Sequence, residues 1–241
     1  MLPWDYGVAP VSFLDVGQGD CIHIHYGGRD ILIDGGGSYY TNVAEKTLKP
    51  YLLKNGIRSI DLAIITHEDM DHSKGIYELD EIFDIKKILT NHEVYNISEG
   101  EENDLCLVLS ARIEGLDFLF MSDADFARES ALLQENPELS CDVLKLGHHG
   151  SAGSTGEDFL SAVSPSFAAI SCGVNNRYGH PADRVVELLE NSGIMYGRTD
   201  LSGALCLRKV TDRYYIFENA AKDRQWRIPR TLPRSIPPGP S

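Results

Sequence analysis

The sequence has no paired cysteines, no long apolar run and no excess of positive charge. Its five cysteines are scattered and none belongs to a CxxC pair, which is typical of free thiols in a reducing compartment. No segment approaches the roughly 18 apolar residues of a membrane-spanning helix. Residues 1–10 contain neither the basic nor the apolar part of a secretory signal. We therefore expect a cytoplasmic protein with no membrane span.

The composition that remains is that of a globular, acidic domain. Hydrophobic residues make up 42% of the 241 residues and charged residues 24%, which is enough for one large core. The formal net charge of -14 argues against a protein that binds nucleic acid nonspecifically through a basic surface. It does not exclude a nuclease, because bound cations can neutralise the acidic residues of a site. We expect one domain over residues 1–220.

The end of the chain differs from the rest in composition. Residues 222–234 include five basic side chains and one acidic side chain, and residues 232–240 are rich in proline. Such a segment cannot build a core of its own. We expect residues 221–241 to form a basic, proline-rich tail. Two interpretations stay open: a solvated extension, or an arm that docks on a protein partner or binds phosphate.

Short runs rich in β-branched and aromatic residues alternate with single helical segments. A hairpin is expected where Glu114-Gly115 separates two such runs. The alternation predicts an α+β fold in which sheets are covered by helices. The expected strands are 11–16, 21–26, 30–33, 62–65, 86–90, 105–110, 116–120, 143–146, 167–171, 204–210 and 214–217, and the expected helices are 43–54, 126–133, 156–163 and 181–193.

The densest group of potential metal ligands lies in residues 66–72, Thr-His-Glu-Asp-Met-Asp-His. It directly follows an apolar run that predicts a buried strand. A turn at a strand end cannot remove so much charge from water cheaply, and a bound cation offsets the cost. The spacing suits two cations, because His67 and Asp69 can face one position while Asp71 and His72 face another.

Further polar side chains also stand just after expected strands: Asp34, Asp123, the pair His148-His149 and, after a longer loop, His180. Strand ends from different parts of a chain often assemble one site. Imidazole and carboxylate together suit zinc or manganese. Taken singly, Asp34 is equally explained as a turn residue, Asp123 as a helix cap and His180 as a surface residue. The adjacent histidines between glycines favour a functional role.

Together these clusters resemble the metallo-β-lactamase fold superfamily and, more narrowly, the soluble hydrolase domain of the ComEC competence proteins. The resemblance implies an α+β fold, a four-layer αβ/βα sandwich with the site along one edge of the two sheets. It rests on the segments 13–20, 32–36, 66–75, 142–151, 176–181 and 198–200.

The resemblance also implies a centre of two divalent metal ions, zinc or manganese. Its ligands would be His67, Asp69, Asp71, His72, Asp123 and one of His148 and His149. Asp123 would bridge the ions, with His67 and Asp69 on one side and Asp71, His72 and one of the two adjacent histidines on the other. The choice between the two adjacent histidines stays open. The upstream histidine that many superfamily members use as a third ligand has no clear equivalent, so we expect a ligand-poor first site.

The residues expected to act in catalysis are Asp71, His149 and His180. The metals would activate a water that attacks phosphorus. His149 or His180 would contact the phosphate or protonate the leaving oxygen. Asp34 would orient a ligand histidine from behind the metal ligands.

Three functions follow as hypotheses. The first is a metal-dependent phosphodiesterase or nuclease, with nucleic acid as partner and DNA as the preferred substrate. The second is a hydrolase of small phosphoesters, similar to a phosphocholine esterase. The third is a regulatory binding module with weak catalysis, supported only by the missing third ligand. Metal analysis separates the third from the others, and a substrate panel separates the first two.

Overall fold

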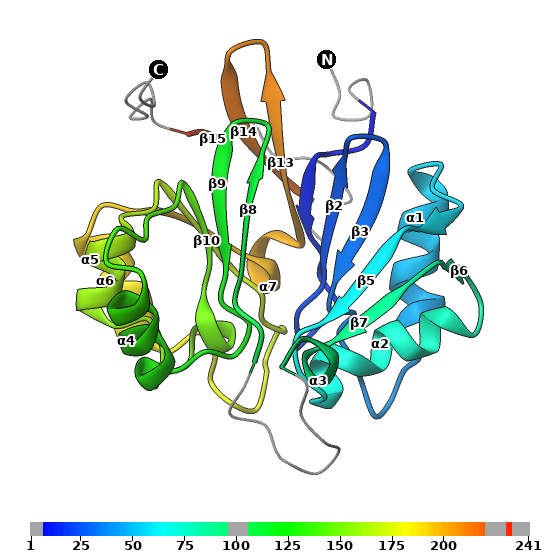
Figure 1. Cartoon of the computed structure of the whole chain (residues 1–241), viewed down its shortest axis with the longest axis horizontal. Coiled ribbons are helices and arrows are strands. Elements are labelled where there is room, and N and C mark those ends of the chain that lie inside the picture. Colours follow the sequence, from blue (N-terminus) through cyan, green and yellow to red (C-terminus); the bar gives the residue numbers. More distant parts are fainter. Residues whose placement is uncertain (1–6, 96–105, 220–229, 233–241) are drawn as a thin grey trace.

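The computed structural model describes residues 7–95, 106–219 and 230–232. Two β-sheets face each other at the centre, and helices cover the outer face of each sheet (Figure 1). Apolar side chains of both sheets meet between them, where the rings of Phe13 and Phe120 lie 6.4 Å apart. The expected α+β fold, a four-layer αβ/βα sandwich, is therefore confirmed.

The first sheet has eight strands in the order β15-β14-β13-β1-β2-β3-β5-β7. Its strands pair antiparallel from β15 to β3, whereas β3, β5 and β7 are parallel to one another. Their bounds are β1 Val11–Phe13, β2 Ile22–Tyr26, β3 Arg29–Ile33, β5 Leu62–Ile65, β7 Ile88–Thr90, β13 Ala204–Val210, β14 Arg213–Asn219 and β15 Arg230–Thr231. A separate parallel pair joins β4, Ser59–Ile60, to β6, Asp84–Ile85.

A helical layer covers the outer face of this sheet. Leu48, Leu52 and Ile76 of these helices form one buried cluster with Leu32 and Ile65 of the sheet. Such burial on one face is the main source of stability for a short amphipathic helix. The segments are η2 Ala44–Leu48, a π-helical turn that continues as α1 Lys49–Lys54, then α2 Met70–Asp80; α3 Asn91–Tyr95 follows β7.

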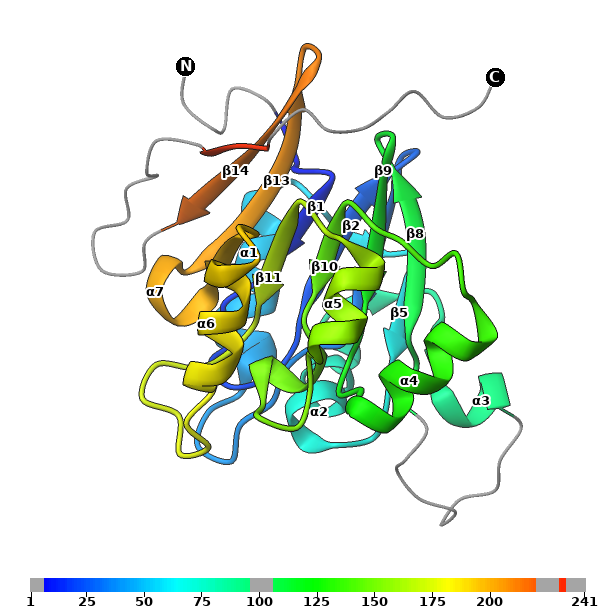
Figure 2. The same ribbon diagram turned by 90° about the vertical axis from the view of Figure 1, so that its left-hand side faces the viewer.

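The second sheet has five strands in the order β12-β11-β10-β9-β8, and β9 to β12 all run parallel. Helices α4, α5 and α6 cover its outer face (Figure 2). The strands are β8 Leu109–Ile113, β9 Leu116–Phe120, β10 Val143–Lys145, β11 Phe167–Ile170 and β12 Met195–Arg198. The helices are α4 Phe126–Glu135, α5 Glu157–Val163 and α6 Asp183–Asn191, with α7 Thr199–Ser202 leading back to the first sheet.

One expected strand is displaced. The sequence favoured a strand over 105–110, but β8 runs from Leu109 to Ile113. The reason is the two-residue turn Glu114-Gly115, whose φ angles of 53° and 89° match the tight hairpin geometry. Such a turn leaves no linker, so the strand must run directly into it. Residue 105 itself lies outside the described residues.

A piece of the expected tail joins the first sheet. Arg230–Thr231 forms β15 and pairs with β14, and the side chain of Leu232 is buried in the core between the sheets. The other residues of 221–241 lie outside the described part of the chain. Among the described residues, no helix combines the length and hydropathy needed to cross a membrane.

Candidate metal centre

The polar clusters meet at one edge of the sandwich because their strands end there. In the first sheet β3 and β5 are parallel, and in the second β9, β10 and β11 are parallel. The carboxyl ends of parallel strands lie at the same edge of a sheet, where open sheets bind ligands. The loops after these five strands therefore bring distant parts of the sequence into one place.

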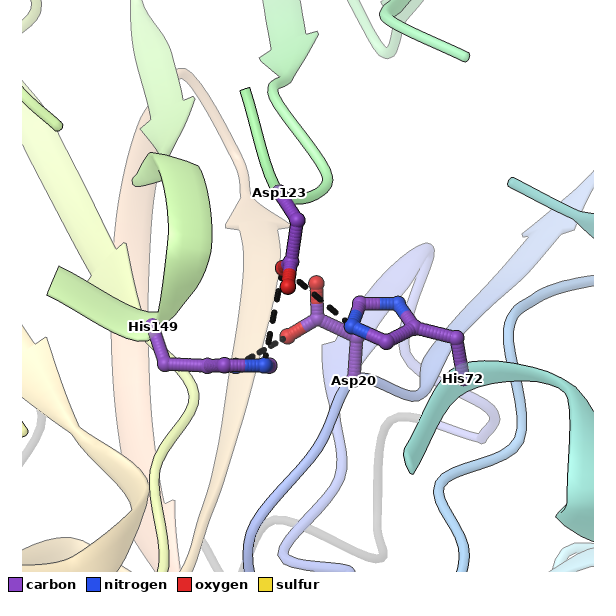
Figure 3. Close-up of side chains that lie close together, drawn as sticks. All are labelled: Asp20, His72, Asp123 and His149. Carbon is purple, nitrogen blue, oxygen red and sulfur yellow. Dashed lines mark ion pairs between the residues drawn. The ribbon is translucent and has the colours of Figure 1, made fainter. Parts of the chain in front are cut away.

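The carboxylate of Asp123 lies at the centre of four imidazoles. Its Oδ1 is 3.2 Å from His72 Nε2 and 3.5 Å from His149 Nε2 (Figure 3). Its Oδ2 is 3.6 Å from His148 Nε2 and 3.9 Å from His67 Nε2. The two oxygens of one side chain thus face two separate pairs of histidines. The alternative role of Asp123 as a helix cap does not apply, because the side chain of Asp125 caps α4 by accepting from Arg128 N at 2.9 Å.

Two of the three carboxylates in residues 66–72 divide between the pairs. Asp69 Oδ2 lies 3.6 Å from His67 Nε2, and Asp71 Oδ2 lies 3.5 Å from His149 Nε2. The first ligand group is therefore His67, Asp69 and His148, and the second ligand group is Asp71, His72 and His149. Each adjacent histidine joins a different group. The first ligand group gains the third side chain that the sequence did not reveal.

These side chains fit a bound cation by the chemistry of their unpaired atoms. Asp123 Oδ1 and the Nε2 atoms of His67, His72 and His149 are buried and accept or donate no hydrogen bond within the described residues. Buried polar atoms are nearly always paired, and a bound cation would give these four atoms a partner. Ligand atoms of Asp20, His72, Asp123 and His149 also lie within 4.8 Å of one another.

The carboxylate of Asp34 fixes the orientation of His72. Its Oδ2 lies 2.8 Å from His72 Nδ1, which must donate because a carboxylate only accepts. Thr66 holds the carboxylate in turn, donating from its backbone N at 2.8 Å and from Oγ1 at 2.7 Å. A hydrogen bond at Nδ1 leaves the Nε2 lone pair free for a metal. That Asp34 orients a metal ligand stays a prediction, which this hydrogen bond to His72 supports.

His149 is oriented by a backbone carbonyl. Its Nδ1 donates to the oxygen of Ser171 at 3.0 Å and lies 3.3 Å from Asp20 Oδ1, so Nε2 again faces the centre. Burial alone lowers the pKa of His149, but the carboxylates of Asp123 and Asp20 outweigh it and raise the pKa to about 9. A metal needs the neutral ring, so binding releases a proton from this residue near neutral pH.

The adjacent histidines sit on strained backbone. His148 has φ 46° and ψ 47°, and His149 has φ 55° and ψ 21°. Two successive left-handed residues other than glycine are costly and persist mainly at functional sites. The bond from His148 N to Ser122 O at 2.8 Å and the bond from Ser151 N to His148 O at 2.8 Å hold the turn. This conformation points the two rings into different ligand groups.

Two buried residues behind the centre were not among the predicted site residues. Asp20 is 1% exposed and Lys145 is 0% exposed, and their side chains form an ion pair. Burial raises the pKa of Asp20, but the Lys145 ammonium and the His149 ring hold it well below its usual range. Lys145 carried a signal in the sequence, since it interrupts an otherwise apolar strand. Asp20 had no such signal beyond its place in the turn after Gly19.

Gly19 lets this turn approach the metal motif. A Cβ at Gly19 would lie 2.2 Å from the carbonyl oxygen of Asp71, and its φ is +130°. The backbone N of Asp20 donates to that same oxygen at 3.2 Å. Only glycine combines this φ with so close a contact.

His180 lies at the rim of the centre. Its ring centroid is 5.7 Å from that of His148 and 6.2 Å from that of His149. Burial and then the imidazoles of His149 and His148 lower the pKa of His180. In front of the first ligand group is a cavity of about 570 Å³, whose wall includes Asp69 and Arg128.

The chain is similar to known proteins in sequence and in fold. Residues 14–105 match the family described as Metallo-beta-lactamase superfamily. ComE operon protein 3 of Bacillus subtilis (strain 168) is 31% identical over 256 residues, covering 82% of this chain and 33% of that protein. Competence protein ComA of Neisseria gonorrhoeae is 30% identical over 222 residues, covering 82% of this chain and 32% of that protein.

A solved structure shares the fold alone. A mutant of CmlA beta-hydroxylase has a TM-score of 0.51 at 13% identity, covering 83% of this chain and 53% of that chain. The fold and the family match place the chain in the metallo-β-lactamase superfamily, and the described residues include a cluster that could hold a metal ion. Within that class it is similar to the ComEC-like competence proteins, and it spans about a third of the length of the relatives it matches.

Proposed function

We propose that the chain is a metal-dependent phosphodiesterase that cleaves nucleic acid, with DNA as the first substrate. The observation that carries this proposal is the pair of ligand groups that share the carboxylate of Asp123. Two divalent ions, zinc or manganese, would supply an activated water and neutralise charge on the phosphate. Similarity to competence proteins supports a role on DNA.

The residues of the chain would divide the remaining work. Asp123 holds both ligand groups against one another, while Asp34 and the Ser171 carbonyl keep the coordinating nitrogens turned inward. Burial and then the imidazoles of His149 and His148 lower the pKa of His180, whose ring would orient a phosphate oxygen through an N–H bond. Arg128 on the cavity wall offers a guanidinium to a second phosphate oxygen.

A substrate panel with a metal series tests the proposal. Single-stranded DNA, duplex DNA, RNA and a small phosphodiester are each offered with Mn²⁺ or Zn²⁺. Asp71→Asn should lose metal-dependent hydrolysis. Glu68→Gln is the matched control from the same motif, because Glu68 instead accepts from the Tyr77 hydroxyl at 3.1 Å. Full activity of Asp71→Asn, or nucleic acid left intact with both metals, contradicts the proposal.

The cavity favours one alternative. Its volume of about 570 Å³ is within the range that holds small ligands, so a small-phosphoester hydrolase is the second candidate. Cleavage of the small substrate alone in the panel would favour it. The regulatory-module hypothesis rested on a missing ligand, and His148 lies on that side. The cytoplasmic location and the docking role of residues 221–241 stay predictions.

A further inference from the structure

Two loops carry exposed aromatic rings at the rim of the metal centre. Tyr178, in the loop before α6, is 54% exposed, while Tyr39 and Tyr40, in the loop after β3, are 77% and 93% exposed. Both loops extend past the same edge of the sandwich as the metal centre (Figure 1). The mechanism above uses none of these tyrosines.

One of the loops forms a stack of rings that leads into the centre. The ring of Tyr178 stacks on His180 at 5.6 Å and 24°, and His180 stacks on His149 at 6.2 Å and 28°. The guanidinium of Arg177 lies 4.8 Å from the Tyr178 centroid, and its Nη2 donates to the Tyr178 hydroxyl at 2.7 Å. Nearly parallel π-faces therefore run from solvent to a ligand of the second group.

The loop is held in this shape before any ligand arrives. Asn176 donates from Nδ2 to the Gly173 carbonyl at 2.9 Å and to the His180 carbonyl at 2.6 Å, and its Oδ1 accepts from His180 N at 2.9 Å. A preorganised surface loses less entropy on binding.

We propose that Arg177, Tyr178 and His180 form a stacking ladder that seats unpaired nucleobases beside the metal centre. The inference rests on the proposed nuclease function and names its substrate as single-stranded nucleic acid. Base faces are free in a single strand and hidden in a duplex, and aromatic or guanidinium stacking accepts any base. The net charge of -14 points the same way, since binding to phosphates alone would need a basic surface.

The test measures binding of a fluorescent single-stranded oligonucleotide by its fluorescence anisotropy. EDTA is present throughout, so that no cleavage occurs. The matched ligand is an abasic oligonucleotide of the same length, which keeps the phosphates and lacks the bases. Tyr178→Ala should weaken binding of the base-bearing strand about 5- to 150-fold, the range of one stacked base, and leave the abasic strand unaffected. Tyr178→Phe should bind as the wild type does.

Tyr26→Ala is the control, since Tyr26 is 49% exposed at the opposite end of β2. Equal affinity of the wild type for base-bearing and abasic strands overturns the ladder. So does an equal loss for both ligands in Tyr178→Ala, or preference for a duplex. Single-stranded RNA and DNA arms show which sugar is accepted. If the protein binds the base-bearing strand selectively but cleaves no nucleic acid after metal is added, the nuclease function is contradicted and the stacking ladder is supported.

Discussion

Replacing Lys145 with methionine should destabilise the metal-free protein strongly. The ammonium of Lys145 pairs with Asp20, and both side chains are at most 1% exposed. Methionine keeps the apolar stem but leaves the Asp20 carboxylate buried and without its main partner. Removing one partner of a buried ion pair costs about 3–5 kcal/mol, because the other charge stays desolvated. Urea unfolding at constant m measures this loss.

A double variant separates charge from packing. Lys145→Met together with Asp20→Asn removes both charges, so its loss should be smaller than that of Lys145→Met alone. The pH dependence has a defined sign. In the wild type the lowered pKa of Asp20 stabilises the fold fully above the unfolded pKa of this residue, and this stabilisation is lost as pH falls from there through the lower, folded pKa.

In Lys145→Met the ammonium that lowers the pKa of Asp20 is gone, so burial raises this pKa. Protonation of Asp20 then removes the buried charge. The deficit of the variant relative to the wild type should therefore shrink as pH falls toward the acidic range. If Lys145→Met lowers the free energy of unfolding by less than about 1 kcal/mol at neutral pH, and the urea dependence m is unchanged, the pair behaves as an exposed ion pair does. That result would contradict a buried charge on Asp20.

Three other outcomes follow from the geometry. Calorimetric Zn²⁺ titration in two buffers should reveal proton release, with affinity rising up to about pH 9, because the pKa of His149 is about 9 before metal binds. Asp34→Asn should lower metal affinity about 10- to 100-fold in the same assay, by releasing His72. Gly19→Ala should lower the thermal midpoint, since its Cβ would meet the Asp71 carbonyl at 2.2 Å; an unchanged midpoint argues against that contact.

The sequence predicted the four-layer sandwich and the edge where the polar clusters meet. Apolar runs marked the strands and indicated sheets covered by helices, whereas the four-layer sandwich and the edge that carries the site were implied by the resemblance to the superfamily. Asp20 was not predicted as a site residue because it lies between β1 and β2, which are antiparallel. Lys145 was not predicted because its role depends on a partner, Asp20, that is 125 residues away in the chain.

The division of His148 and His149 between two ligand groups lies beyond any sequence pattern. It depends on two positive φ angles in succession, which propensity does not predict for histidine. The strand β8 is a smaller example of local geometry that the sequence pattern did not predict. The two-residue turn at Glu114 places this strand closer to the turn than the sequence indicated. The ring stack at Tyr178 likewise requires the loop conformation that Asn176 imposes.

The central claim is that Asp123 joins two ligand groups, and an anomalous X-ray difference map of zinc-soaked crystals tests it most directly. The account predicts two peaks per chain, both against the Asp123 carboxylate. One should lie among His67, Asp69 and His148, and the other among Asp71, His72 and His149. A single peak, or a peak bound by both His148 and His149, would contradict it.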